Sequence, residues 1–343
     1  MAWYNEQGED GNIIISSRIR LARNLKEFPF PHRMKEEDFA RVLKKCRDIY
    51  EQNSWLKNDF IWIDMENTPP LERQKLVEKH LISLDMMNNP KGRALMLSLD
   101  ENVSIMLNEE DHIRIQVIYS GIELEQGLLL AEKVDDVLSA SLEIAFSPKL
   151  GYLTSCPTNL GTGLRASAMI HLPMLMESGH IEQLLAAVSR MGIAVRGLYG
   201  EGSKAIGNLF QVSNQVTLGL SEMEIINRLT EIIQNIVSKE REVRRQIVLT
   251  QKDRLADRVW RSYGVMQYAR MLSSNELLAL ISDIRIGADL GIITIEAKEL
   301  NQLLIEASPA HVADLCGNQT SSQQRDIKRA EIVRKIKIRG DFI

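Results

Sequence analysis

Three consecutive acids lie between two short runs in which apolar and polar residues alternate, and they are Glu109, Glu110 and Asp111. Alternation with a period of two is typical of β-strands, so we expect two strands joined at or near the acids. In a sheet with one buried face, the apolar residues of the second run point inward: Ile113, Ile115 and Val117. Its polar residues then share the opposite face with the acids: His112, Arg114 and Gln116. This arrangement is suited to chemistry, although a solvated hairpin turn is the commoner explanation of an acidic triplet.

Residues 12–21 form a β-branched run that carries two arginines two positions apart, Arg18 and Arg20. In an extended segment these two side chains share one face. Neighbouring guanidinium groups repel each other unless an anion lies between them, and phosphate oxygens match the arginine fork. Because an Arg-x-Arg pair is also common on solvated surfaces, it indicates a phosphate site only weakly when taken alone.

A segment rich in Gly, Thr and Asn follows Tyr152 and carries Cys156 and Arg165. We expect a strand, then a loop, then a helix that begins near Leu164, with N–H groups of the loop available to an anion. Arg165 in the first turn of that helix would oppose the helix dipole unless an anion lay near it. Neither a Walker loop nor a Gly-x-Gly-x-x-Gly motif is present. Cys156, in a polar loop, is a better candidate for a functional thiolate of lowered pKa than Cys46, which lies on an apolar helical stripe.

A third segment, residues 193–203, is predicted to be a strand that runs into a glycine-rich loop and presents Arg196 and Glu201. Its glycines are suited to hinges for closure over a substrate, and equally to an ordinary turn.

The composition excludes several classes of protein. Apolar residues make up 44% of the 343 residues, charged residues 26%, and the formal net charge is −4. We therefore expect no general affinity for nucleic acid or for an anionic membrane. Three widely spaced cysteines support neither a disulfide framework nor a zinc site, and the pattern shows no metal-ligand cluster. With no export signal and no membrane-spanning run, we expect a cytoplasmic protein.

The periodicities predict an α+β fold with a change of character near Leu249. Ahead of it, short strands alternate with helices over residues 35–55, 69–81, 123–146 and 184–191, followed by a long helix that begins at a capping pattern at Ser221. Beyond it, only helices are expected. We predict a catalytic domain at residues 1–249 and a small all-helical domain at residues 250–343.

Five sequence segments, in the same order, resemble the signatures of the phosphagen (guanidino) kinases. They are Ser17-Arg-Ile-Arg, Asn108-Glu-Glu-Asp-His, Cys156-Pro-Thr-Asn-Leu-Gly-Thr, Arg196-Gly-Leu-Tyr-Gly-Glu and Phe210-Gln-Val-Ser-Asn. The resemblance covers roughly residues 12–249. It implies an antiparallel sheet surrounded by helices, and transfer of the γ-phosphoryl group of ATP to a guanidinium nitrogen.

The same resemblance implies roles for individual residues. Glu110 matches the catalytic base, Glu201 the second carboxylate that binds the guanidinium, and Cys156 the thiolate beside it, while Glu109 and Asp111 match supporting charges. The implied ATP-binding set contains the five arginines and their neighbours: Ser16, Ser17, Arg18, Ile19, Arg20, His80, Arg114, Arg165, Ala166, Ser167, Ala168, Met169, Arg196, Gly197, Leu198, Tyr199 and Gly200. For His80 a structural role is the simpler explanation. Mg²⁺ is expected to be held mainly by phosphates and water.

Two features are similar to the bacterial protein-arginine kinases of this family: few residues precede Asn12, and a helical tail follows Leu249. An open site is what a protein substrate requires. In those kinases a motif in the tail binds phosphoarginine. Its counterpart here is Arg325 and Asp326, followed after two residues by Arg329 and Ala330. Arginine side chains of proteins are the implied substrates. The implied partners are a heat-shock repressor, a zinc-binding activator and a Clp ATPase that degrades the marked proteins, and the tail is suited to a homodimer.

Two alternatives stay open at this point. A small-molecule arginine kinase would prefer free L-arginine to protein as the acceptor. An adaptor that reads phosphoarginine through the tail would bind it without turnover, although the complete set of catalytic residues argues against this.

Overall fold

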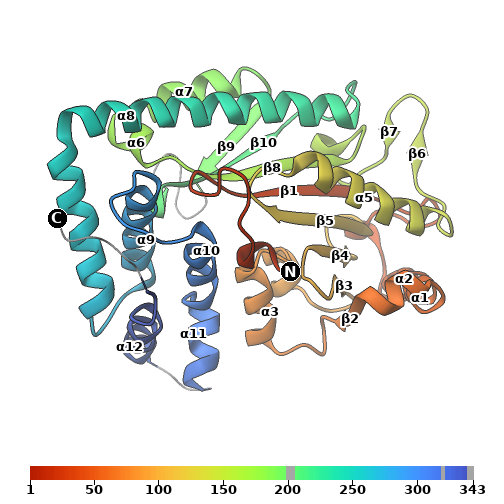
Figure 1. Cartoon of the computed structure of the whole chain (residues 1–343). Helices are drawn as coiled ribbons and strands as arrows, with labels where there is room; N and C mark the ends of the chain where they lie inside the picture. The colour runs from red at the N-terminus through yellow and green to blue at the C-terminus, as the bar shows by residue number, and fades with distance from the viewer. Residues whose placement is uncertain (198–204, 318–320, 338–343) are drawn as a thin grey trace.

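The centre of the structure is an antiparallel sheet, seen in the computed structural model together with the helices around it (Figure 1). The structure describes residues 1–197, 205–317 and 321–337. Within these residues eight strands form the sheet, in the order β2-β3-β4-β5-β1-β8-β10-β9. They are β1 (Ile14–Arg23), β2 (Phe60–Asp64), β3 (Ala94–Ser98), β4 (Val103–Leu107), β5 (Ile113–Ser120), β8 (Leu164–His171), β9 (Ile193–Gly197) and β10 (Leu209–Asn214). A small hairpin contains β6 (Phe146–Ser147) and β7 (Gly151–Tyr152).

Helices surround the sheet, as the sequence predicts. The helices of the N-terminal part are α1 (Glu36–Gln52), α2 (Ser54–Asp59), α3 (Pro70–Glu78), α4 (Leu84–Asn88), α5 (Leu124–Ser139), α6 (Pro173–Glu177) and α7 (Ile181–Ser189). Helix α8 (Glu222–Tyr268) begins at the predicted cap, where Ser221 and Glu224 form a capping box. Helix α5 contacts β1 and β5, and α8 contacts β8 and β10. The fold is therefore the predicted α+β arrangement, an antiparallel sheet surrounded by helices.

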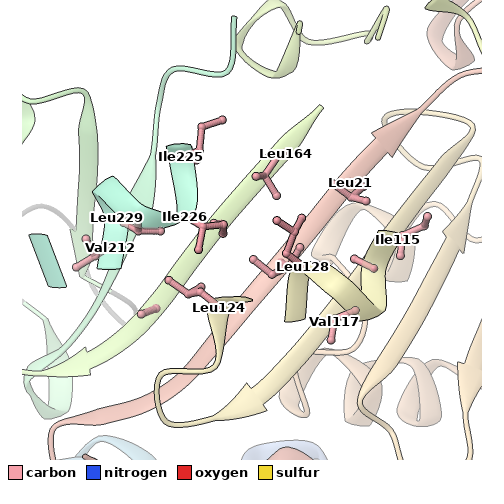
Figure 2. Close-up of a cluster of buried hydrophobic side chains, with 14 of the residues drawn as sticks. Leu21, Ile115, Val117, Leu124, Leu128, Leu164, Val212, Ile225, Ile226 and Leu229 are labelled. Carbon is pink, nitrogen blue, oxygen red and sulfur yellow. The ribbon is translucent and has the colours of Figure 1, made fainter. Parts of the chain in front are cut away.

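The main apolar core lies between one face of the sheet and helices α5 and α8 (Figure 2). Ile115 and Val117 of β5 point into it, as predicted from their alternation, beside Leu124 and Leu128 of α5. Every second residue of each central strand is buried in this way. Because a slip of one residue would move these side chains to the other face, the core fixes the register of the strands.

The prediction of a helix that begins near Leu164 is wrong, because β8 starts there. Leu164, Ala166, Ala168 and Ile170 all lie in the apolar core, so the period of this segment is two. Strands β1 and β10 pair with β8 on either side. Small residues and preceding glycines favour a loop and a helix locally, but pairing with two neighbours decides for a strand. Arg165 consequently lies on a strand, and the helix-dipole argument does not apply to it.

Three further expectations need correction. His112 does not share the polar face, because its ring is buried: Nδ1 accepts a hydrogen bond from the Leu25 amide and Nε2 lies 3.0 Å from the Pro29 carbonyl oxygen. The helix predicted over residues 123–146 ends at Ser139. His80, expected on the helix that begins at Pro70, lies two residues beyond its end with a φ of +62°.

Helix α8 crosses the predicted domain boundary at residue 249 without ending. It contains one non-helical residue, Gln251, and Figure 1 shows it running along the sheet and then turning toward the C-terminal helices. These are α9 (Ser274–Asp289), α10 (Ala297–Glu306), α11 (Pro309–Cys316) and α12 (Ser322–Val333). Helices α9, α10 and α12 enclose a separate apolar core with the end of α8. No helix in the described part of the chain is long and apolar enough to cross a membrane.

Buried polar contacts hold the C-terminal helices against the sheet. The Glu240 carboxylate accepts hydrogen bonds from the amides of Met174 and Leu175 and pairs with Arg244, which also pairs with Asp289 of α9. Arg285 of α9 is fully buried and donates to the Gly11 carbonyl. Charged groups removed from water need such partners, so the two parts of the chain meet in a defined orientation.

A second contact joins α3 to the N-terminus of α11 (Figure 1). The Glu78 carboxylate accepts hydrogen bonds from the Ser308 hydroxyl and from the amides of Ala310 and His311, and it lies 2.8 Å from His311 Nδ1. Burial alone would raise the pKa of Glu78, but these hydrogen bonds outweigh it and hold the pKa below its ordinary value of 4.5. A carboxylate at a helix N-terminus is stabilising, so Glu78 caps α11 from outside the helix.

Replacing Glu78 by Gln should destabilise the protein by about 1–3 kcal/mol at neutral pH, because charge-assisted hydrogen bonds are lost. A pKa lowered on folding stabilises the folded state above the unfolded pKa. The difference between wild type and E78Q should therefore shrink as the pH falls below about 4.5. Thermal unfolding from pH 7 to pH 4 measures it, with the exposed Glu231→Gln as the control. Equal melting temperatures at pH 7 would contradict the capping role.

Candidate active site

Four arginines gather on the face of the sheet opposite the main apolar core. Arg18 and Arg20 belong to β1, Arg114 to β5 and Arg165 to β8. Arg20 is paired in register with Arg165 on one side, and on the other with Gln116, two residues from Arg114. The fifth predicted arginine, Arg196 of β9, is paired with Gln211 of β10, whose side chain accepts a hydrogen bond from Arg18 at 2.9 Å. The alternation of the strands therefore aligns all five on one side.

The guanidinium groups of this cluster are held in an unfavourable environment. Burial lowers the pKa of Arg18 to about 10, and the charges of Arg165 and Arg114 add to the effect. Burial, followed by the charges of Arg18, Arg114 and Arg165, lowers the pKa of Arg20 well below its ordinary value, and Glu109 opposes this. The Nε atoms of Arg20 and Arg165 are buried, with no hydrogen-bond partner among the described residues. A polyanion in the cluster would relieve the repulsion and satisfy these donors.

The acid loop, residues 108–112 between β4 and β5, approaches the cluster through Arg114. One nitrogen of Arg114 lies 2.5 Å from a Glu109 oxygen and another pairs with Glu110. The two carboxylates differ in exposure: the Glu109 side chain is 4% exposed and accepts a hydrogen bond from the Ser83 hydroxyl, whereas that of Glu110 is 42% exposed. Glu110 is thus the acid that a ligand can reach.

Asp111 has a positioning role. It is fully buried, and its carboxylate accepts hydrogen bonds from Asn24 Nδ2 at 2.6 Å and from the Ser155 amide at 2.7 Å. These bonds tie the acid loop to the end of β1 and to the residue before Cys156. The Cys156 sulfur is half-buried and lies 3.0 Å from the Thr158 hydroxyl. Burial and the charges of Arg196 and Arg114 lower the pKa of Arg165, whereas Cys156 and Glu110 oppose this lowering. Cys156 and Glu110 therefore both lie near the Arg165 guanidinium.

Two cavities meet at Glu110. One of about 100 Å³ is lined by Arg20, Arg114 and Arg165, and the other of about 540 Å³ by acidic and apolar residues that include Asp85 and Phe39. Glu110 lines both. A carboxylate between a cationic cavity and an acidic one can accept a proton from a cationic ligand on one side while an anion is bound on the other.

Comparison with known proteins identifies this arrangement. The model of the ATP:guanido phosphotransferase C-terminal catalytic domain matches residues 41–243, more than half of the chain. The chain belongs to the ATP:guanido phosphotransferase family. A second model, of the protein-arginine kinase McsB C-terminal domain, matches residues 252–338.

Curated relatives of this phosphotransferase extend over almost the whole chain. The protein-arginine kinase of Caldanaerobacter subterraneus subsp. tengcongensis is 45% identical over 325 residues, which are 94% of this chain and 96% of the relative. The protein-arginine kinase of Bacillus subtilis is 44% identical over 336 residues, 97% of this chain and 92% of the relative.

Two solved structures share the fold of this chain. The comparison with a lombricine kinase gives a TM-score of 0.60 at 23% identity and covers 68% of this chain and 68% of the other. A duplicated taurocyamine kinase from Schistosoma mansoni with bound transition state analog components has a TM-score of 0.62 at 24% identity. That comparison covers 78% of this chain and 39% of the other.

The ATP-binding set implied by the sequence divides between the two faces of the phosphotransferase sheet. A small cavity beside the arginines is lined by Ser16, Arg18, His80, Ser167, Met169 and Gln211. Ile19, Ala166 and Ala168 instead point into the apolar core, and the Ser17 hydroxyl accepts a hydrogen bond from the Glu123 amide at the start of α5. Gly197 ends β9, and Leu198, Tyr199, Gly200 and Glu201 lie outside the described residues.

Some residues of the site escaped the sequence analysis, and His80 has a mixed role. Gln211 and Ser213 of β10 accept hydrogen bonds from Arg18 and Arg165, and the period of two in Phe210-Gln-Val-Ser-Asn was the available signal.

His80 lies between the cavity and Trp3, and its carbonyl accepts a hydrogen bond from Gln116. Burial and Arg18 lower its pKa to about 4, so the ring is neutral at pH 7. Cys46 is a core residue, and burial raises the pKa of its thiol to about 12.

Replacing Arg165 by Ala should weaken nucleotide binding by about 10- to 100-fold, because charge-assisted hydrogen bonds to an anion are lost. The ligand-free variant should be no less stable than wild type, since one of several mutually repelling charges has been removed. Calorimetry with ATP and thermal unfolding without it measure the two effects. Arg33→Ala, an exposed arginine away from the cluster, is the control. Unchanged ATP affinity in R165A would place the phosphates elsewhere.

Proposed function

We propose that this phosphotransferase transfers the γ-phosphoryl group of ATP to arginine side chains of proteins. The observation that carries the proposal is the position of Glu110 between the arginine-lined cavity and the larger acidic one. It is supported by relatives named protein-arginine kinase that match 94–97% of the chain.

The residues suggest how the transfer proceeds. Arg18, Arg20, Arg114, Arg165 and Arg196 would bind the phosphates, and the clamp would neutralise the charge on the equatorial oxygens during in-line transfer. A guanidinium with a pKa above about 12 is a poor nucleophile, so its attacking nitrogen must lose a proton. Glu110 would accept that proton as the N–P bond forms and the bond to the β–γ bridging oxygen breaks, with ADP leaving.

Two further groups complete the proposal. Cys156 would lie beside the acceptor guanidinium and orient it without attacking it. No group of three or more His, Cys, Asp or Glu residues is placed to hold a metal in residues 1–197, 205–317 and 321–337. We therefore propose that Mg²⁺ is held by the phosphate oxygens and by water, where it would neutralise developing negative charge.

We propose as well that the C-terminal helices bind phosphoarginine through Arg325 and Asp326 of α12. The Asp326 side chain is 29% exposed and pairs with Arg329 at 2.6 Å, so a guanidinium can approach its free edge. Arg329 is buried and also donates to the carbonyls of Ala307 and Leu272, and Ala330 is fully buried. We therefore propose that Arg329 positions Asp326, and that Arg325 and Asp326 make the direct contacts with phosphoarginine.

The resemblance to protein-arginine kinases suggests the biological setting. We propose that the phosphorylated proteins are a heat-shock repressor and substrates passed to a Clp ATPase and its protease. A zinc-binding activator protein, a homodimer formed through the C-terminal helices and a cytoplasmic location belong to the same proposal.

The Glu110→Gln variant should lower kcat by about 10²- to 10⁴-fold with ATP affinity nearly unchanged, because the proton acceptor is lost and the phosphate clamp is kept. The assay gives Mg-ATP, an unfolded arginine-containing protein and free arginine together and follows acid-labile phosphate by phosphorus NMR. Glu231→Gln is the control. Full activity of E110Q would remove Glu110 from the role of base. Label on free arginine alone would favour a small-molecule arginine kinase instead.

Arg325→Ala and Asp326→Ala should each weaken phosphoarginine binding by about tenfold or more, because each removes one charged partner of the ligand. Titration calorimetry with phosphoarginine on the E110Q background measures binding without turnover. Lys328→Ala on the same helix, which breaks a half-buried pair with Glu331, is the matched control. Wild-type affinity in both variants would exclude this site.

A further inference from the structure

The acidic cavity beside Glu110 is larger than a guanidinium requires. Its volume is about 540 Å³, and pockets of about 300–1,000 Å³ enclose whole drug-sized ligands. Ser155, the residue before Cys156, lies in its wall together with Glu110, so the cavity adjoins the reacting groups. Space remains for more than one side chain next to the acceptor.

The walls of this cavity come from three elements on the same side of the acid loop. Pro31 and His32 belong to the short 3₁₀ helix Pro31–Arg33, Phe39 to α1 and Asp85 to α4. The Ser83 hydroxyl accepts a hydrogen bond from the Met86 amide and donates to Glu109 at 2.6 Å. This hydrogen bond fixes the start of α4, and with it Asp85, relative to the acid loop.

The charge of the lining is negative. Three carboxylates, those of Asp85, Glu109 and Glu110, line the cavity together with one guanidinium, Arg93. Arg114 pairs with Glu109 and Glu110, so three negative and two positive charges give a net charge of −1 for these groups. Arg93 lies 2.7 Å from Asp85, yet the Asp85 side chain is still 52% exposed. The exposed ring of His32 stacks on Phe30 with 6.2 Å between ring centroids. Apolar and cationic groups suit these walls, and a further carboxylate does not.

We propose that this cavity binds the polypeptide on either side of the acceptor arginine, with His32 and Asp85 as specificity-determining residues that favour basic over acidic neighbours. The inference rests on the proposed transfer to protein arginine. It adds a subsite to that reaction: the acceptor guanidinium reaches Glu110, while neighbouring side chains lie against Phe39, His32 and the Asp85 carboxylate.

The test compares two peptides with one central arginine, flanked on both sides by Lys in one and by Glu in the other. In wild type, kcat/KM should be higher for the Lys peptide. We define the preference ratio as kcat/KM for the Lys peptide divided by kcat/KM for the Glu peptide. This ratio should rise by about two- to fivefold in His32→Glu and fall by a similar factor in His32→Lys, because a single exposed charge has an effect of this size. Asp85→Asn, which keeps hydrogen-bonding groups toward Arg93, should also lower it.

Controls separate this subsite from a general change in the enzyme. Arg33→Glu, one residue along the same 3₁₀ helix and outside the cavity lining, should leave the ratio at its wild-type value. ATP affinity and thermal stability of the His32 variants should match wild type, because His32 is exposed. The ratio should approach one at high salt, where exposed charges are screened.

The outcomes distinguish the two levels of the proposal. If both peptides are phosphorylated and wild type, H32E, H32K and D85N all give the same ratio of kcat/KM, the subsite is overturned. The proposed transfer to protein arginine would still stand. Label on free arginine and on neither peptide would overturn the proposed function, and the subsite with it.

Discussion

The structure depends on a group of like charges buried on one face of a sheet. Burial, and after it the charges of neighbouring arginines, lowers the pKa of Arg18, Arg20 and Arg165. Glu109 opposes this lowering at Arg20, and Cys156 and Glu110 oppose it at Arg165. Such a cluster is unfavourable without a ligand and must be held by the rest of the fold. The apolar core on the other face provides this, because the register that buries Leu21 and Leu164 there is the register that aligns the arginines.

In the acid loop, two carboxylates that pair with the same arginine differ in how far a ligand can reach them. Arg114 pairs with both Glu109 and Glu110, but Ser83 holds the first in a buried site and the second remains open to ligands. The loop around them is fixed by a left-handed residue, Asn108, whose side chain donates to two backbone carbonyls, and by Asp111. A reactive carboxylate placed by rigid neighbours loses little freedom when a substrate binds.

Much of this could be predicted from the sequence, and the failures have physical causes. The period of two around residues 109–111 predicted two strands and placed Arg114 beside the acids, because alternation is a local property. That Arg18, Arg20, Arg114, Arg165 and Arg196 belong to one cluster was implied only by the family resemblance. The strand at Leu164 was missed because pairing with β1 and β10, which is not local, overrides small residues and glycines. The family resemblance assigned whole segments to the ATP site, but alternate residues of a strand lie on opposite faces of the sheet. Ile19 and Ala166 therefore lie in the apolar core instead. The burial of Asp111 and His112 depends on Asn24, Ser155 and Leu25, which are distant in sequence.

Helix α3 connects the C-terminal helices to the arginine face by direct contacts. Glu78 near its end caps α11, the next residue accepts a hydrogen bond from Trp3 Nε1 through its carbonyl, and His80 lines the cavity beside Arg18. Gln116, on the strand that carries Arg114, holds the His80 carbonyl. A displacement of α11 would therefore act first on the charged cap at Glu78 and then, within two residues, on His80 in the wall of the cavity beside Arg18. Energetic coupling between distant sites needs contiguous contacts of this kind, together with two arrangements that the ligands stabilise differently.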